Sequence, residues 1–261
     1  MLVHLLRSAT SRGIELSSIL VGTFRAEQMS VNLNDKLVAV TGAFGTLGAA
    51  VVRAAQIAGA RVAAIDRAAA PGPTAALGEA TLFGGVDLAD SAAAKDTFGA
   101  VARSLGGLDA LVNIAGAFRW ETLADGNLDT WDLLYRVNVR TAAAASKAAL
   151  VHLRKRGGGR IVNVGAAGAI KAAAGMGAYA ASKAGVARLT EALAEELKDD
   201  RITVNAVLPS IIDTPPNRAE MPNADFERWV KPEQLADVIV FLLSDRASAI
   251  TGALLPVVGR V

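Results

Sequence analysis

Short apolar runs alternate with helical patterns along the chain from residue 36 onward. A short run rich in valine and isoleucine is typical of a strand buried in a parallel sheet, whereas a longer alanine-rich stretch indicates a helix. The expected strands are residues 36–41, 61–66, 81–86, 108–113, 159–164, 202–207 and 253–258. The expected helices are residues 45–57, 91–105, 128–139, 140–155, 179–197 and 232–243. This alternation predicts an α/β fold, a doubly wound parallel sheet of about seven strands with helices on both faces.

No linker rich in glycine, proline or serine interrupts residues 35–261, so we expect a single domain that spans residues 31–261. Apolar residues make up 52% of the chain, which is enough to bury a sheet on both faces. Residues 1–30 differ in composition and are expected to form an extension outside the core. Their scattered arginines and serines resemble a transit peptide, and an upstream start before Met29 is the alternative interpretation.

The composition argues against several classes of function. A net charge of +2 is too small to indicate nucleic-acid binding or attraction to an anionic membrane. The apolar stretch at residues 17–22 is too short to span a bilayer. The chain has no cysteine and 2 histidines, which leaves no thiolate site and few ligands for any metal. We therefore expect no metal, no nucleic acid and no membrane partner, and a protein of the reducing cytoplasm.

Glycines cluster where the first expected strand becomes a helix. Gly42, Gly45 and Gly48 form this turn, and Leu47 lies among them. Glycine allows a tight turn and lets the backbone approach a phosphate, and the amino end of a helix favours negative charge. The turn therefore predicts a site for the pyrophosphate of a dinucleotide, in a single domain of the Rossmann-like kind.

Acidic and polar residues follow the next strands. Asp66 closes the second strand near the spacing expected for an acid that binds the adenosine ribose. Its carboxylate would repel a 2′-phosphate, so NAD is the expected cofactor, while the neighbouring Arg67 leaves NADP open. Asp87 follows the third strand, where it either binds the adenine or serves as an acid at the start of the next helix. Further cofactor contacts are expected at the close of the fourth strand, from Asn113, Ala115 and Gly116.

Tyr179 and Lys183 occupy positions i and i+4 of an expected helix. Side chains with this spacing lie on the same helix face, so the two groups should point together. An ammonium beside a phenol favours the phenolate, so Lys183 is expected to lower the pKa of Tyr179 and prepare it for proton transfer. A proton donor combined with a hydride cofactor predicts an oxidoreductase.

Together these residues resemble the short-chain dehydrogenase/reductase family over nearly all of residues 35–261. The motifs that carry the resemblance are Thr41-Gly42 with its glycine turn, Asp66, Asp87, Asn113-x-Ala115-Gly116, Asn138, Tyr179-x-x-x-Lys183 and Pro209 through Thr214. The resemblance implies that Tyr179 is the proton donor, that Lys183 binds the nicotinamide ribose, and that Asn138 supports a water-linked proton relay. It also implies that the nicotinamide lies against the segment of Pro209, Ile212 and Thr214.

Two positions depart from the family pattern. The middle glycine of the turn stands at Gly45, and position 46 is Thr46. Ala166 stands where most members carry a catalytic serine, and its methyl group cannot donate a hydrogen bond to a substrate carbonyl. Losing one such donor typically costs ~10²–10³ in rate. Both departures are similar to those of quinonoid dihydropteridine reductases, whose substrate is a conjugated imine that accepts hydride without a strongly polarised carbonyl.

The substrate side of the site is expected to be aromatic. Residues 210–230 resemble the substrate-covering loop of the dihydropteridine reductases. Phe118, Trp120 and Trp229 are candidates for stacking on a flat ring, with packing as the alternative for Trp120. Asn138, by contrast, is an ordinary feature of the wider family.

Three functions remain open from the sequence. The first is an NAD(P)H-dependent reductase of an activated acceptor, with a quinonoid dihydropteridine as the specific candidate. The second is a general carbonyl or alcohol oxidoreductase in which water or a backbone amide replaces the serine. The third is a non-catalytic dinucleotide-binding or sensing protein, for which the retained Tyr179, Lys183 and Asn138 would have no use. We also expect a homo-oligomer, dimer or tetramer. The family resemblance implies that residues 140–155 and 179–197 form its interface, and small apolar residues cover more than one face of the second helix.

Overall fold

The part of the chain that the structure describes, residues 31–72 and 76–261 of a computed structural model, is built on one sheet of seven parallel strands. The extension expected at residues 1–30 lies outside the described residues. The strands are β1 (Leu37–Thr41), β2 (Arg61–Ile65), β3 (Thr81–Phe83), β4 (Ala110–Asn113), β5 (Gly159–Val164), β6 (Ile202–Pro209) and β7 (Leu254–Val257). Their order in the sheet is β3-β2-β1-β4-β5-β6-β7, and every neighbouring pair is parallel. The predicted doubly wound parallel sheet is confirmed.

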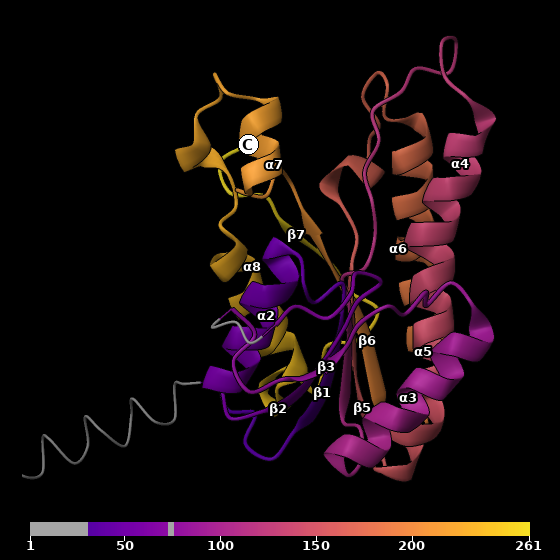
Figure 1. The fold of residues 1–261 in the computed structure, drawn as a ribbon, viewed down its shortest axis with the longest axis vertical. Coiled ribbons are helices and arrows are strands. Elements are labelled where there is room, and N and C mark those ends of the chain that lie inside the picture. The colour runs from indigo at the N-terminus through magenta and orange to yellow at the C-terminus, as the bar shows by residue number, and fades with distance from the viewer. Residues whose placement is uncertain (1–30, 73–75) are drawn as a thin grey trace, which may run out of the picture. The chain divides into compact units, whose positions relative to one another are not determined.

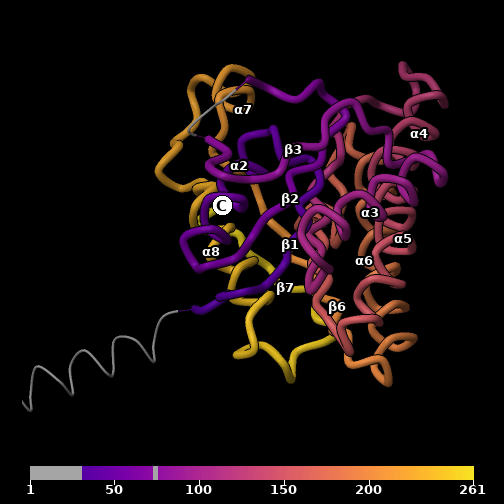
Figure 2. The backbone as a smooth tube through the Cα atoms, turned by 60° about the horizontal axis from the view of Figure 1, so that its bottom comes forward, coloured from indigo at the N-terminus to yellow at the C-terminus, as the bar shows by residue number. Residues whose placement is uncertain are grey.

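Helices cover both faces of the sheet, as Figure 1 shows. Two of them, α2 (Thr46–Ile57) and α8 (Pro232–Leu243), pack against each other on one face. On the other face lie α3 (Ser91–Leu105), α5 (Thr141–Lys155) and α6 (Gly177–Leu197), and the turned view in Figure 2 shows the same division. The shorter helical segments are α4 (Leu128–Leu134), η1 (Tyr135–Arg140), η2 (Ala167–Ala169), α7 (Pro215–Glu220), η3 (Phe226–Arg228) and η4 (Asp245–Ala247).

The direction in which the chain builds the sheet reverses beside β1. The chain runs outward from β1 to β3, then crosses to β4 on the other side of β1 and continues outward to β7. Connections that leave in opposite directions open a crevice at the carboxyl ends of the two strands between them, here β1 and β4. Ligands of open α/β sheets bind in such a crevice, and the glycine turn that follows β1 lies there.

The two strands beside this crevice are held between buried layers. Every residue of β1 is buried, and so is every residue of β4. Phe98 of α3, Leu153 of α5 and Leu111 of β4 are fully buried in one apolar cluster. Close-packed layers of this kind shift little, so the carboxyl ends of β1 and β4 provide a rigid base for a site.

One helical region differs from the prediction in its geometry. The helices expected at residues 128–139 and 140–155 form one continuous run, in which α4 passes through the π-helical turn η1 before α5 begins at Thr141. The Thr141 hydroxyl donates a hydrogen bond of 3.2 Å to the carbonyl of Arg136. A π turn holds one residue more than an α turn and is frequent at functional sites.

Two smaller differences have local causes. The prediction extends the third strand to residue 86, but β3 ends at Phe83, before Gly84 and Gly85. Gly85 has a φ of 75°, which turns the chain away from the strand direction. The prediction has no helix at α7, a short helix that Thr214 caps and that begins with a proline.

Candidate active site

A cleft of about 640 Å³ opens at the crevice beside β1. The glycine turn, the end of β2, the loop after β4, η1 and the start of α7 all line it. The predicted cofactor residues among its lining are Gly42, Gly45, Leu47, Gly48, Asp66, Arg67, Asp87, Ala115, Gly116 and Thr214. Sites for cofactor-sized ligands typically have volumes of roughly 300–1,000 Å³, so the cleft has the size of such a site.

Two close approaches shape the glycine turn. Gly42 has a φ of 66°, and a Cβ there would lie 2.7 Å from the backbone nitrogen of Ala115. A Cβ at Gly48 would lie 2.1 Å from the carbonyl oxygen of Gly42. Glycine at both positions therefore lets the turn close against the loop after β4 and against the first turn of α2. The amino end of α2, which no side chain caps, favours a phosphate group at the turn.

Asp66 follows β2 with its carboxylate held by backbone groups on both sides. Its Oδ2 accepts a hydrogen bond of 3.0 Å from the N–H of Phe44, within the glycine turn. Its Oδ1 accepts one of 3.0 Å from the N–H of Ala68. A carboxylate oxygen has two acceptor positions, so each oxygen retains one for a ribose hydroxyl. Arg67 lines the same part of the cleft.

Asp87 lies in the cleft lining and forms an ion pair with Arg136. The distance from Arg136 Nη2 to Asp87 Oδ2 is 2.6 Å, and this hydrogen bond, followed by one from the N–H of Ala89, holds the pKa of Asp87 below its usual range. Asp87 does not cap α3, because Asp90 accepts hydrogen bonds from the first N–H groups of that helix. Arg136 was not predicted from the sequence. A sequence feature that could have indicated it is its position close to Asn138 in the same helical run.

Asn113 faces the interior of the fold and does not line the cleft. Its side-chain amide donates to Ser146 Oγ at 3.1 Å and to Asn163 Oδ1 at 2.9 Å. These bonds join β4 to α5 and β5 beneath the site. The loop after β4 is instead held by Thr41, whose hydroxyl accepts from the N–H of Ala115 at 3.3 Å. The structure thus places Asn113 among the supports of the site rather than among its contact residues.

Tyr179 and Lys183 lie on the same face of α6, but their electrostatics differ from the prediction. Burial raises the pKa of Tyr179 to about 12 and lowers the pKa of Lys183 to about 8. The Lys183 Nζ donates a hydrogen bond of 2.8 Å to the carbonyl of Val164, at the end of β5. The prediction that Lys183 lowers the pKa of Tyr179 is therefore wrong in this structure. Removal from water dominates at both groups and favours both neutral forms.

Asn138 joins the loop after β4 to α6. Its Oδ1 accepts from the N–H of Ala117 at 2.9 Å, and its Nδ2 donates to the Ala117 carbonyl at 3.0 Å and to Ser182 Oγ at 2.9 Å. Both amide hydrogens are engaged, so the predicted water relay would use the second acceptor position of Oδ1. A Cβ at Gly116 would lie 2.4 Å from Asn138 Oδ1 and 3.5 Å from Lys183 Nζ. Gly116, which lines the cleft, therefore lies against Asn138 and close to Lys183.

Ala166 is buried where β5 ends, directly before η2, which packs against α6. A Cβ at the preceding Gly165 would lie 2.4 Å from Leu208 Cδ2, so a side chain there would require the end of the Leu208 side chain to move. The same strand end is held to α6 by the bond from Lys183 to Val164. The methyl group of Ala166 thus occupies a packed position beside α6, and neither Gly165 nor Ala166 offers a hydroxyl.

Two of the three aromatic residues expected to face a substrate are exposed. The Phe118 side chain is 49% exposed, and its ring meets that of Tyr179 edge to face with centroids 4.9 Å apart. Trp120 is 62% exposed. Trp229 is buried and packs against Phe226 at 4.8 Å between centroids. Trp229 therefore belongs to the packing of its own segment and presents no open ring face.

The segment after β6 has a defined shape beside the cleft. Asp213 and Arg218 form a two-point ion pair of 2.5 and 2.7 Å, and Ile212 takes part in a short parallel bridge. Thr214 lines the cleft while its side chain caps α7. Pro209 and Ile212 are not among the residues that line the cleft.

No helix within residues 31–72 and 76–261 is long and apolar enough to cross a membrane. The same residues contain no group of three or more His, Cys, Asp or Glu side chains placed to hold a metal ion.

Comparison with known proteins identifies the family. Residues 36–225 match the family model described as short chain dehydrogenase. The chain belongs to the short-chain dehydrogenase family. It is 33% identical to 2-(S)-hydroxypropyl-CoM dehydrogenase 3 of Xanthobacter autotrophicus, over 88% of this chain and 98% of that protein. It is 34% identical to the inactive 2-(S)-hydroxypropyl-CoM dehydrogenase 2 of the same organism, over 80% of this chain and 98% of that one. The solved structure of carveol dehydrogenase from Mycobacterium avium in complex with NAD is similar with a TM-score of 0.76 and 26% identity, over 88% and 98% of the two chains.

Membership in the short-chain dehydrogenase family makes the chain an oxidoreductase, with NAD(P) as the cofactor of its family. The predicted family, fold and enzyme class are thereby confirmed. The finer resemblance to quinonoid dihydropteridine reductases is not confirmed. The three similar proteins named above are called hydroxypropyl-CoM and carveol dehydrogenases.

Replacing Lys183 by methionine should stabilise this short-chain dehydrogenase at pH 7. Burial lowers the Lys183 pKa from 10.5 to about 8, so the unfolded chain binds the proton more tightly than the folded one. The difference disfavours folding by ~3 kcal/mol below pH 8 and disappears as the pH rises from 8 to 10.5. Loss of the bond to Val164 offsets ~1 kcal/mol, which leaves a net gain of ~2 kcal/mol for Lys183→Met.

Urea unfolding of Lys183→Met and of the original protein at pH 7 and pH 10.5 measures this effect. The gain should be present at pH 7 and absent at pH 10.5, whereas Lys171→Met, at an exposed position, should show neither. An equal change in stability at both pH values would contradict a buried lysine with a lowered pKa.

Proposed function

We propose that this protein is an NADH-dependent reductase that transfers hydride to an acceptor already activated by conjugation. The observation that carries the proposal is Ala166, a buried methyl group at the place where most family members carry a serine hydroxyl. A ketone needs a donor on its oxygen as negative charge develops there, and losing one donor typically costs ~10²–10³ in rate. A conjugated imine or quinone spreads that charge over its own bonds and depends less on such a donor.

Tyr179 supplies the proton in this scheme. A phenol with a pKa of about 12 stays protonated at neutral pH, which suits a donor in reduction better than a base in oxidation. When bound, a reduced nicotinamide would supply the hydride, so that the acceptor would gain two electrons and two hydrogens in total and the nucleotide would be oxidised. Water then returns the proton to the Tyr179 Oη. Lys183 and Asn138 border this reaction at Gly116 and hold the strand end and the loop in place.

A quinonoid dihydropteridine is the specific acceptor we propose, because it is a conjugated imine and because the two departures at Gly45 and Ala166 resemble the enzymes that reduce it. A second candidate function is the oxidation of alcohols or the reduction of ketones with another donor in place of the serine. The name of the relative 2-(S)-hydroxypropyl-CoM dehydrogenase 3 favours this second function.

A panel of acceptors separates the two functions. NADH oxidation is measured with quinonoid dihydropterin, a quinone, a simple ketone and an aldehyde at equal concentrations. The proposal expects turnover with the first two at least ~10²-fold above the ketone and the aldehyde, the size of one missing donor. Ketone turnover as fast as dihydropterin turnover would favour the second function, and no turnover with any member would agree with a non-catalytic binding protein.

NADH should bind more tightly than NADPH, by about tenfold. The Asp66 carboxylate is fixed by the N–H groups of Phe44 and Ala68 at the cleft, where a 2′-phosphate would approach it. Two like charges about 4 Å apart near a protein surface repel by about 1–4 kcal/mol, and 1.4 kcal/mol is a factor of ten in affinity. Fluorescence titration with both nucleotides measures the ratio.

Asp66→Asn should reduce this preference for NADH, because it removes the repelling charge. The exposed Asp237 on α8 provides a control, and Asp237→Asn should leave the ratio unchanged. Tighter binding of NADPH than NADH would contradict the assignment of NAD as the cofactor. It would indicate that Arg67, which lines the same cleft, binds the 2′-phosphate.

The chain should form a homo-oligomer in solution. The prediction rests the interface on the helices at residues 140–155 and 179–197, but much of the apolar side of α6 is already buried within the monomer. Exposed apolar side chains lie on the α4–α5 run; among them are Leu128, Trp131, Tyr135 and Val151, with exposed fractions of 69%, 38%, 60% and 51%. Such a surface is typical of an interface with a second copy.

Light scattering at micromolar concentration should therefore give a multiple of 26.8 kDa. Val151→Glu should lower the mass, whereas Ile57→Glu on α2, at an apolar side chain that is 88% exposed and apart from this surface, should not. A mass near 26.8 kDa for the unaltered protein would refute the prediction.

A further inference from the structure

The loops after β4 and β5 are joined to each other above the site. The indole Nε1 of Trp120 donates a hydrogen bond of 3.0 Å to the carbonyl of Ala174. The N–H of Glu121 donates one of 2.8 Å to the carbonyl of Gly175. Two bonds between the same pair of loops fix the Trp120 side chain relative to β5 and α6, which carry the rest of the site.

Gly175 allows the indole to lie directly on the backbone. It has a φ of 73°, and a Cβ there would lie 2.2 Å from Trp120 Cε2. An alanine would meet the ring itself, which cannot bend away as the end of a flexible side chain can. Gly175 is therefore a positioning residue for Trp120.

The loop that carries Trp120 is also braced internally. The Glu121 carboxylate accepts from the N–H of Asn127 at 3.0 Å, and Thr122 Oγ1 donates to Asp125 Oδ2 at 2.7 Å. The N–H of Gly126 donates to the Thr122 carbonyl at 3.0 Å. A loop with this many internal bonds holds its side chains in one place before a ligand arrives, which lowers the entropy lost on binding.

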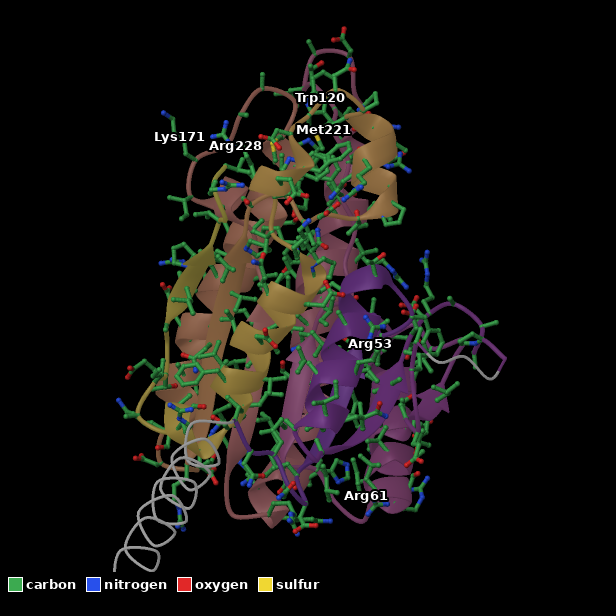
Figure 3. All side chains as sticks on the ribbon, turned by 90° about the vertical axis from the view of Figure 1, so that its left-hand side faces the viewer. Arg53, Arg61, Trp120, Lys171, Met221 and Arg228 are labelled. Atoms are coloured by element: carbon green, nitrogen blue, oxygen red, sulfur yellow. The ribbon has the colours of Figure 1, made fainter. Side chains whose placement is uncertain are left out.

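The braced aromatic rings nevertheless remain open to solvent. Trp120 is 62% exposed although its only polar group is already bonded, so an apolar ring face is left in water. Figure 3 shows Trp120 at the end of the molecule opposite Arg61, the first residue of β2, and so at the carboxyl ends of the strands, where the site lies. Phe118, in the same loop, contacts the Tyr179 ring. Exposed apolar surface of this kind is typical of a binding site.

We propose that Phe118 and Trp120, together named the aromatic platform, bind a flat fused-ring acceptor and make it the preferred substrate class over small aliphatic carbonyl compounds. This inference rests on the proposed function, since it concerns the acceptor of the same hydride. The ring system lies against the platform while its reacting atom stands at the Tyr179 hydroxyl. Trp120 determines specificity by contact, and Gly175 determines it by holding Trp120 in position.

Two acceptors with the same reacting group test the platform. Phenanthrenequinone carries its 1,2-dicarbonyl on a flat fused ring, and butane-2,3-dione carries it on a short aliphatic chain. Trp120→Ala should lower kcat/KM for the quinone about tenfold more than for the dione, because stacking on one aromatic ring is lost. The loss should appear in KM rather than in kcat, and Trp120→Phe should restore part of it.

A matched pair of glycine variants tests the positioning role of Gly175. Gly157 has a φ of 80°, close to the 73° of Gly175, but a Cβ there would meet nothing within 4 Å. Both alanine variants therefore introduce similar backbone strain, and only Gly175→Ala displaces the indole. Gly175→Ala should shift the ratio of the two kcat/KM values in the same direction as Trp120→Ala, and Gly157→Ala should leave it unchanged.

Binding measured without turnover separates this inference from the proposed function. Phenanthrenequinone should quench tryptophan fluorescence in the presence of NAD, and Trp120→Ala should weaken its apparent affinity about tenfold while Trp131 and Trp229 still report. If the quinone binds in a way that depends on Trp120 but NADH is not oxidised, the aromatic platform would be supported and the proposed function would be overturned. Absent quenching, affinity unchanged in Trp120→Ala, or equal kinetic losses for both acceptors would overturn the platform.

Discussion

Tyr179→Phe should lower turnover by about 10²–10⁴-fold while the affinity for NADH stays the same. The change removes only the hydroxyl, so the edge-to-face contact between this ring and Phe118 remains and α6 keeps its packing. The proton must then come from water that no residue positions, which is why the loss appears in kcat. Initial rates with the best acceptor of the panel, together with nucleotide titration, measure both quantities.

The chain offers a matched control for this substitution. Its other tyrosine, Tyr135, is 60% exposed on η1 and does not line the cleft, and Tyr135→Phe removes the same atom there. Turnover should be unchanged in that variant. Unchanged kinetics in Tyr179→Phe would mean that the proton comes from another group. The raised pKa of Tyr179 would then result from packing and have no role in turnover.

Ala166→Ser should raise the reduction of simple ketones by about 10²–10³-fold. The new hydroxyl would stand where the family carries its serine and would donate to the oxygen of the substrate as charge develops. Reduction of an activated acceptor should change much less, because such an acceptor needs this donor least. The ratio of ketone to dihydropterin turnover in the two proteins is the measurement.

A second serine variant shows whether position or polarity is responsible. Ala169 lies in η2 close to Ala166, and Ala169→Ser adds the same hydroxyl away from the family's position. It should not change ketone turnover. If ketone turnover is also unchanged in Ala166→Ser, another group already polarises the carbonyl. That result would favour the oxidation of alcohols or the reduction of ketones over the reduction of an activated acceptor.

Most of the fold could be predicted because its signals are local. A buried parallel strand appears as an apolar run, and the expected bounds of β5 and α3 agree with those of the structure. The glycine turn could be predicted for the same reason, since the tight contacts of Gly42 and Gly48 require glycine whatever surrounds them. The alternation of strands and helices, joined by right-handed crossovers, then predicts a parallel sheet with helices on both faces.

The electrostatics of the site depend on contacts between distant segments, so the sequence could not supply them. The spacing of Tyr179 and Lys183 indicates that they are neighbours, but their pKa values follow from burial, which Phe118 and Val164 help to produce. Trp229 was predicted to stack on a substrate, but in the structure the fold of its segment packs it against Phe226.

The π turn η1 changes the rotational phase of the longest helical run. An α-helix advances about 100° per residue, so one additional residue turns everything beyond it by about that angle. Leu133 and Val137 line the cleft, and the adjacent Asn138 donates a hydrogen bond to Ser182 on α6. The length of the chain in this turn thus sets which side chains α5 directs toward the sheet. Homologous segments that differ there by one residue would share their side chains but not their alignment in space.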